Sequence, residues 1–139
     1  MNNSINLKFT DSLILLFILI VFFAVGFIFY TEIIKNKKIT SARNNFYEVK
    51  KEFIFNLQKC SDESQEWNFG GSCSDLPNID NIVNFFNVEQ KLINPYEKGL
   101  GVNGSPGSVL IELDNQAIII SIDVDANGGI DIKHLFTLV

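Results

Sequence analysis

One stretch near the carboxyl terminus carries oxygen side chains at the spacing of a calcium-binding loop. Asp123, Asp125 and Asn127 stand at alternate positions and are followed by Gly128. This pattern opens an EF-hand-type loop, in which alternate side-chain oxygens bind the cation and the glycine permits a sharp turn. Asp131 follows at the ninth position, where a further ligand acts through water. The spacing predicts a Ca²⁺ site formed by Asp123, Asp125, Asn127 and Asp131.

Two features of this stretch depart from that loop type. The twelfth position is His134 instead of the usual Glu, and the flanking segments have the pattern of strands, not helices. The alternative interpretation is a β-hairpin with acidic residues on its solvent face. Calcium is therefore the one cofactor that the sequence suggests, and the sequence requires none.

His134 is the only histidine of the chain. Strand alternation points it inward with Ile132 and Phe136, which predicts a structural role. A Cys–His nucleophile pair would need a reduced cysteine and a third, orienting group. The chain has no phosphate-binding glycine loop, HExxH or GxSxG motif. We therefore expect a protein that is not an enzyme.

The two cysteines, Cys60 and Cys73, enclose a polar, turn-rich segment. A disulfide between them closes a loop of about 15 residues, which is worth roughly 3 kcal/mol in the chain-entropy model. Such a bond forms in an oxidising compartment and predicts an extracytoplasmic head. The alternative is two free thiols. Zinc is disfavoured because two Cys and one His at this spacing match no common site.

The elements that carry these residues follow an apolar run, Leu13–Tyr30, that contains no charge. At about 1.5 Å per residue it forms a helix of about 27 Å, close to the ~30 Å core of a bilayer. A cleaved signal sequence has a shorter apolar core and ends in small residues, whereas this run ends in Phe-Ile-Phe-Tyr. The basic residues after the run would place the head in the cytoplasm by the positive-inside rule, against the argument from the cysteines.

Residues 31–59 contain neither Pro nor Gly and predict an amphipathic continuation of the same helix. The resulting helix of roughly 45 residues far exceeds the usual 11–12. Its apolar positions recur every three or four residues: Ile39, Ala42, Phe46, Val49, Phe53 and Leu57.

Residues 60–139 predict a small head with a Cys loop, a short helix and a sheet. Asp80 is expected to cap the helix at Asn81–Leu92. Strands are expected at Ser108–Asp114 and Ala117–Val124, followed by a third strand. The inward residues of that third strand are predicted to be Ile130, Ile132, Phe136 and Leu138. The fold class is α+β: a long helix packed on a three-stranded antiparallel meander.

Charge divides along the chain. Residues 31–59 contain seven Lys and Arg against three Glu, whereas residues 60–139 contain three Lys against twelve Asp and Glu. A basic stem and an acidic head can attract one another between copies that pack side by side. The alternative is surface charge that only keeps the head soluble. The acidic head disfavours nucleic acid as a partner.

This order of parts resembles the type IV pilin family, including the pseudopilins of type II secretion. The resemblance rests on Phe9-Thr10 opening the apolar helix, the polar half-helix ending at Cys60, Asn94-Pro95-Tyr96 and the terminal β-meander. It implies a leader-like cytoplasmic segment 1–8, a transmembrane half 9–30, an amphipathic half 31–59 and a head 60–139. It also implies processing between Lys8 and Phe9 and assembly through the start of the helix.

Two positions differ from the family pattern. Lys8 replaces the small residue that usually ends the leader, and Leu13 replaces a Glu that pairs with a neighbouring subunit. Asp11 is the nearby carboxylate. The assembly residues are therefore expected to be Phe9, Asp11 and Leu13, in a minor or divergent subunit.

The expected function is a structural subunit of a pilus-like or pseudopilus-like filament. Its expected partners are the membrane, copies of itself or related pilins, and assembly machinery. Its expected location is the inner membrane as a single-pass protein, and the filament or cell surface once assembled. The alternative is a single-pass, membrane-anchored extracytoplasmic binding domain that does not polymerise.

Overall fold

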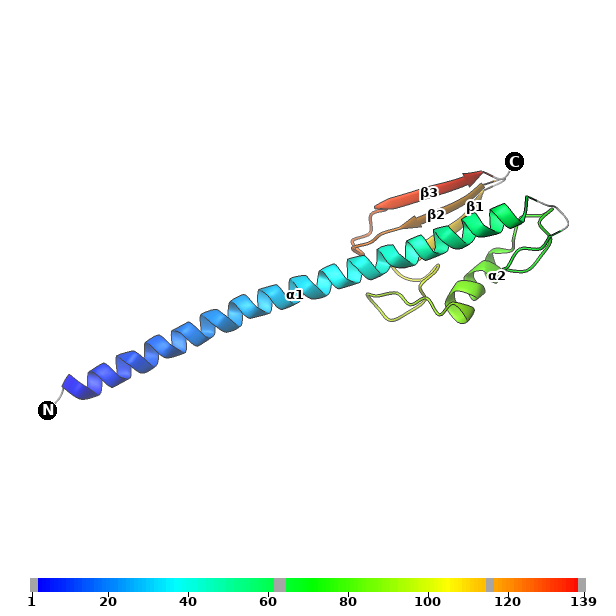
Figure 1. The fold of residues 1–139 in the computed structure, drawn as a ribbon. Helices are drawn as coiled ribbons and strands as arrows, with labels where there is room; N and C mark the ends of the chain where they lie inside the picture. Colours follow the sequence, from blue (N-terminus) through cyan, green and yellow to red (C-terminus); the bar gives the residue numbers. More distant parts are fainter. Residues whose placement is uncertain (1–2, 62–64, 115–116, 138–139) are drawn as a thin grey trace. The chain divides into compact units, whose positions relative to one another are not determined.

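The computed structural model describes residues 3–61, 65–114 and 117–137, and side chains from residue 9 onward (Figure 1). The chain divides into two compact units, one ending at Asn36 and one beginning at Lys37. Each unit is described by itself. The α+β class is confirmed, since a long helix, a short helix and one three-stranded antiparallel sheet follow in that order.

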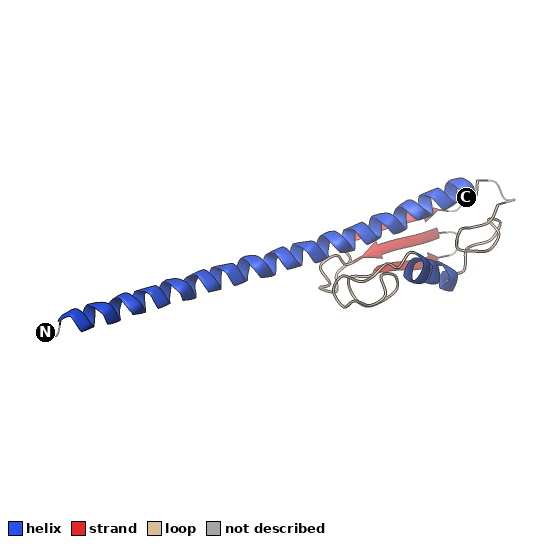
Figure 2. Cartoon of the chain, turned by 60° about the horizontal axis from the view of Figure 1, so that its bottom comes forward, coloured by secondary structure: helices blue, strands red, loops and turns tan. Residues whose placement is uncertain are grey.

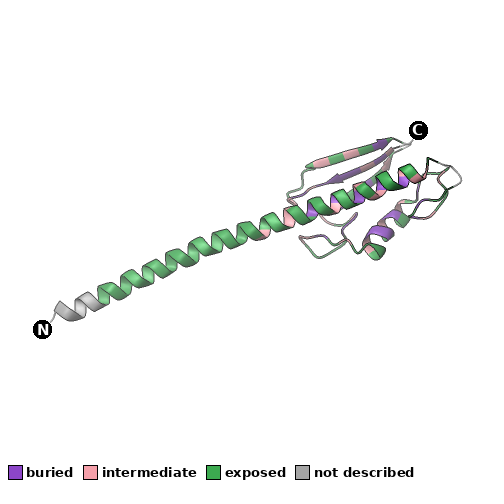
Figure 3. Cartoon of the chain, viewed as in Figure 1, coloured by how far each residue is buried: buried purple, intermediate pink, exposed green. Residues whose placement is uncertain are grey.

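The first unit consists of the amino-terminal part of helix α1, which runs from Asn3 to Lys59. No proline interrupts these 57 residues, so the helical backbone hydrogen bonds continue from one end to the other. Residues 3–12 are helical as well, so the helix begins ten residues before the predicted apolar run that starts at Leu13. Every residue from 9 to 33 is exposed (Figure 3). The helix is long and apolar enough to cross a membrane.

The second unit places the predicted stripe of α1 in a hydrophobic core. Ala42, Phe46, Val49 and Phe53 are almost completely buried, and Ile39 and Leu57 pack against them. The rings of Phe53 and Phe136 lie 5.7 Å apart, which joins the helix to the sheet. The predicted packing of the stripe on the apolar face of the sheet is therefore confirmed.

The sheet is the predicted meander, in the order β1-β2-β3. Its strands are drawn in red in Figure 2. Strand β1 spans Val109–Asp114, β2 spans Ala117–Ile122 and β3 spans Ile132–Thr137. Strands β1 and β2 are shorter than predicted, and Ile130, expected to face inward on the third strand, is 63% exposed. Ile130 precedes the strand, so the alternation that orients side chains does not extend to it. The turn at 115–116 and Leu138 lie outside the described residues.

The short helix differs from the prediction in its start and in its second half. Helix α2 spans Ile79–Asn84, and a π-helical turn, η1, follows at Phe85–Glu89. Asn78 is the N-cap, because its side chain accepts a 2.8 Å hydrogen bond from the backbone N–H of Asp80. The predicted cap at Asp80 is therefore wrong by two positions.

A side chain covers part of the β1 edge of the sheet. Asn103 Oδ1 accepts from the backbone N–H of Ile111 at 2.7 Å, and its Nδ2 donates to the Ile111 carbonyl at 3.3 Å. The amide thus satisfies the backbone N–H and C=O of Ile111, at the centre of the β1 edge, as a neighbouring strand would. The sequence pattern gives no sign of this role.

Candidate functional site

The predicted disulfide is present. Cys60 and Cys73 are bonded, with their Cα atoms 5.1 Å apart. Cys60 directly follows Lys59, the last residue of α1, so the bond ties the loop after the helix to the end of the helix. Trp67 lies in the loop that the disulfide closes, and its side chain is buried. Its Nε1 donates a hydrogen bond to the Asp75 carbonyl at 3.0 Å.

A buried amide next to the disulfide holds the same loop and was not predicted. Asn56 is fully buried in the face of α1 that meets the loop. Its Oδ1 accepts from the backbone N–H of Asn68 at 2.7 Å, and its Nδ2 donates to the Glu52 carboxylate at 2.9 Å. Asn68 Nδ2 donates to the same carboxylate oxygen at 2.9 Å. A polar residue inside an apolar helical stripe was the available sequence signal, since such a residue needs hydrogen-bond partners.

The acidic stretch after β2 brings three of its four predicted ligands together. Carboxylate oxygens of Asp123, Asp125 and Asp131 lie within 4.8 Å of one another. Asn127 belongs to the same loop, where its Nδ2 donates to Asp125 at 2.8 Å and its Oδ1 accepts from Gly129 N–H at 2.9 Å. The predicted spacing therefore corresponds to a real spatial cluster of carboxylates.

Backbone N–H groups bind the same carboxylates. Asp123 accepts from Asn127 N–H and Gly128 N–H, and Asp131 accepts from Val124 N–H at 2.8 Å. Gly128 has a φ of +95°, a conformation that favours glycine. Burial by itself would raise the pKa of Asp123, but hydrogen bonds from the backbone N–H groups of Gly128 and Asn127 help to lower it.

Tyr96 connects the acidic loop to the rest of the head. Its hydroxyl donates to the Val124 carbonyl at 2.6 Å. Burial raises the pKa of the Tyr96 hydroxyl, and the negative charges of Asp125, Asp123 and Asp131 raise it further. Lys38 Nζ lies 5.5 Å from the centre of the Tyr96 ring, a cation–π distance.

This arrangement suits two roles. Carboxylate oxygens that lie within 4.8 Å of one another can bind a hard cation such as Ca²⁺. The same carboxylates also satisfy the backbone of a tight turn, which requires no ion. The Ca²⁺ site thus stays a prediction.

His134 points inward, as alternation predicts. It is half-buried, and its ring lies edge-on to Phe136 at 4.6 Å. Burial lowers the pKa of His134, and the positive charge of Lys50 lowers it further. A neutral ring against an aromatic side chain matches the predicted structural role.

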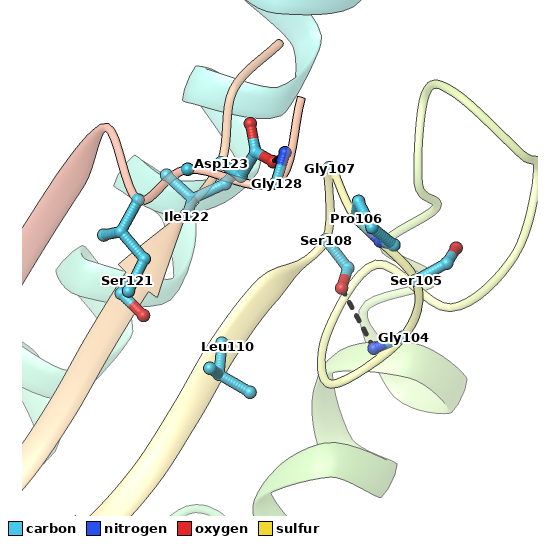
Figure 4. A pocket seen from close by; sticks show the side chains of 12 residues that line it. Gly104, Ser105, Pro106, Gly107, Ser108, Leu110, Ser121, Ile122, Asp123 and Gly128 are labelled. Carbon is cyan, nitrogen blue, oxygen red and sulfur yellow. Dashed lines mark hydrogen bonds between the residues drawn. The ribbon is translucent and has the colours of Figure 1, made fainter. Parts of the chain in front are cut away.

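An open hollow of about 240 Å³ lies where the 104–108 loop meets the outer face of the sheet (Figure 4). Leu110, Ser121 and Ile130 contribute to its lining. The Ser108 hydroxyl accepts from Gly104 N–H at 3.0 Å and holds the loop in place. Gly107 is required there, because a Cβ would come 2.5 Å from the Tyr96 ring.

The predicted assembly and processing residues lie at the start of α1. Phe9, Asp11 and Leu13 are exposed, and Phe9 and Leu13 lie one turn apart on the same face. The bond between Lys8 and Phe9 lies within the helix, but the side chain of Lys8 falls outside the described part of the chain.

Comparison of the chain with protein-family models, with curated proteins and with solved structures finds no match. The resemblance to type IV pilins therefore stays a prediction from the order of parts.

Proposed function

We propose that this protein is a structural subunit of a pilus-like or pseudopilus-like filament, in a minor or divergent role. The observation that carries the proposal is the apolar, exposed half of α1. Each residue from 9 to 33 is exposed, and the run Leu13–Tyr30 has no charge. Apolar surface of this extent requires a cover of lipid or of other apolar helices.

Among the residues that the structure describes, the core of the second unit is formed by side chains of that unit itself. The buried side chains that form the core begin at Ala42 and continue through the sheet. The apolar half of α1 is therefore available to intermolecular contacts, first with lipid and then with neighbouring subunits. Close packing of such helices, with exclusion of lipid, favours assembly.

Phe9, Asp11 and Leu13 are the proposed contact residues at the start of the helix. A carboxylate at membrane depth is costly unless it is paired. Asp11 is therefore the group through which a cationic group of a neighbouring subunit would be recognised. No catalytic step is part of this proposal.

The disulfide supports an extracytoplasmic head. Cys60 and Cys73 are bonded, and such bonds persist in oxidising compartments. The proposed protein is thus anchored once in the inner membrane, with its head outside the cytoplasm and its filament reaching the cell surface.

Intact-mass measurement of the cellular protein, combined with analysis of sheared fibres, tests this function. We expect a mass reduced by residues 1–8, a new amino terminus at Phe9, and recovery in the fibre fraction. Substitution of Phe9 should reduce processing, whereas substitution of the exposed Val88 in the head should not. Chains that keep Met1 and never enter fibres would refute the proposal.

The second candidate is a membrane-anchored extracytoplasmic domain that binds Ca²⁺ and does not polymerise. The three clustered carboxylates favour it. The same experiment separates the two, because this candidate predicts an intact amino terminus and no fibre association.

A further inference from the structure

The two edges of the sheet are covered to different extents. Along the β1 edge, Val102 forms a parallel bridge with Val109, and the Asn103 side chain binds the backbone of Ile111. Strand β3 forms the other edge, and among the residues that the structure describes it pairs only with β2 (Figure 1). Alternate residues of such a strand direct their backbone N–H and C=O groups away from the sheet. We call this open side of β3 the β3 edge.

The β3 edge has the properties that an added strand requires. Proline, whose missing N–H would interrupt pairing, is absent from Ile132–Thr137. These six residues match the usual length of a strand, so a partner strand can form a full set of backbone hydrogen bonds. Leu135 is 54% exposed and offers an apolar contact on the outer face of the sheet. Extended peptides bind to open sheet edges of this kind.

One flank of α1 lies beside β3 on the inner face of the sheet. The rings of Phe53 and Phe136 are 5.7 Å apart, and the positive charge of Lys50 acts on His134. Ile54 follows Lys50 by one helical turn, lies on the same side of the helix and is 40% exposed. Side chains on one face of an added strand would therefore meet this flank, and those on its other face would meet the outer side of β3.

The charges beside the β3 edge are positive. Lys133 lies on β3, Lys50 lies on the adjoining flank of α1, and Arg43 lies two turns before Lys50. In the described part of the chain, none of these three forms an ion pair. Glu112 is separated from β3 by the whole of β2, and Asp131 precedes β3 with its carboxylate bound to a backbone N–H of the acidic loop. The charge next to the edge therefore complements a segment that carries carboxylates.

Charged and apolar residues occupy different halves of the edge. The half around Lys133 and His134 has the cations, because Lys50 lies beside His134. The other half has the apolar side chains of Leu135 and Ile54, since the ring contact of Phe53 with Phe136 places this turn of α1 further along the strand. A matching segment has acidic residues in one half and apolar residues in the other.

From these observations we propose that the β3 edge binds an extended segment of a partner protein, acidic in one half and apolar in the other. The segment adds a fourth strand to the sheet through backbone hydrogen bonds to β3. Its acidic residues pair with Lys133 on the outer face and with Lys50 on the α1 side. The inference goes beyond the proposed function, because it concerns a partner of the head and requires no filament.

Binding of a labelled peptide to the full chain in detergent tests the proposal. The probe is a capped, fluorescent peptide of three valines followed by three glutamates, the order that antiparallel pairing on β3 requires. Its fluorescence anisotropy should rise as the chain is added. The peptide with lysine in place of glutamate should bind about ten-fold more weakly, because like charges then face one another.

Backbone pairing is measured separately from charge. The valine–glutamate peptide should slow the hydrogen–deuterium exchange of alternate amides in β3 and leave the amides of β1 unchanged. N-methylation of alternate peptide residues removes the donors from one side of the added strand. Of the two possible sets of alternate residues, methylation of one should abolish binding, whereas methylation of the other should leave it intact.

Charge variants of the chain locate the contact. Lys133→Glu and Lys50→Glu should each weaken binding of the valine–glutamate peptide about five-fold. Lys91→Glu is the matched control, since Lys91 is exposed in the loop after η1, and it should bind as the parent chain does. Formation of the Cys60–Cys73 disulfide in every variant confirms that the head has folded.

Several results would overturn the proposal. These are no binding at millimolar peptide, equal binding of the lysine peptide, unchanged exchange in β3, or full binding by Lys133→Glu and Lys50→Glu. Slower exchange of β3 that grows with the concentration of the chain alone would place a second copy on the edge and overturn it as well. Recovery of the chain in fibres affects none of these measurements, so this inference and the proposed function fail independently.

Discussion

Replacement of Phe53 by alanine is the most direct test of how the helix holds the head together. Phe53 is completely buried. Its ring centre lies 5.2 Å from that of Phe69, 6.2 Å from that of Phe86 and 5.7 Å from that of Phe136. These three partners come from the Cys loop, η1 and β3, so one side chain joins the helix to three separate parts of the core.

Phe53→Ala is expected to lower the free energy of unfolding by about 3–5 kcal/mol, the usual cost of Phe→Ala in a core. The upper part of this range applies, because aromatic partners on three sides cannot collapse into the vacated space. A domain of this size has a free energy of unfolding of about 5–15 kcal/mol, so the variant should be only marginally folded.

Urea unfolding of the full chain in detergent, followed by the fluorescence of Trp67, measures this loss. Trp67 is the single tryptophan, is buried, and stacks on Phe69 with ring centres 6.3 Å apart. The unfolding midpoint should fall while the slope stays constant, since the variant exposes a similar surface on unfolding.

Phe55→Ala is the matched control, since Phe55 lies two positions along the same helix and is 55% exposed. It should change the free energy of unfolding by less than about 0.5 kcal/mol. The described packing of the helix on the sheet would be refuted if Phe53→Ala lowered the free energy of unfolding by less than about 1 kcal/mol, or by no more than Phe55→Ala does.

Three further outcomes are expected. Replacing Cys60 and Cys73 by serine should lower the free energy of unfolding by about 3 kcal/mol in the same assay, and an unchanged midpoint would contradict the structural role of the bond. Calorimetric titration of the full chain with Ca²⁺ should show binding that Asp123→Asn abolishes and Asp80→Asn leaves intact; no heat at millimolar Ca²⁺ ends the calcium prediction. The folded head should lose stability as the pH falls through 6.5, the ordinary pKa of His134, because a lowered pKa means that the unfolded chain binds the proton first. His134→Gln should remove this dependence, and an identical pH profile in that variant would refute the assignment.

Local repeats were sufficient to predict the main elements. The buried positions of α1 follow a helical repeat, and Val109, Ile111 and Ile120 follow strand alternation. Such repeats decide which side of an element is apolar, and an apolar side must be buried. The predicted packing of helix on sheet followed from these two requirements alone.

Predictions at the ends of elements were less accurate. Asp80 was expected to cap the short helix, but the Asn78 side chain does so. Ile130 was expected to face inward, but it precedes β3 and is exposed. Both positions depend on where a backbone hydrogen bond begins or stops, and apolar spacing does not encode this.

By itself, the sequence determined the long helix, the faces of the three strands, the pairing of the two cysteines and the existence of an acidic loop. Only the tertiary structure decided what the polar residues do. Asn56 holds the Cys loop, Asn103 binds the backbone of Ile111 at the edge of β1, and Tyr96 joins the acidic loop to the head. The physical reason is range: apolar periodicity is a property of neighbouring residues, whereas a buried hydrogen bond needs a partner that only the folded chain brings within about 3 Å.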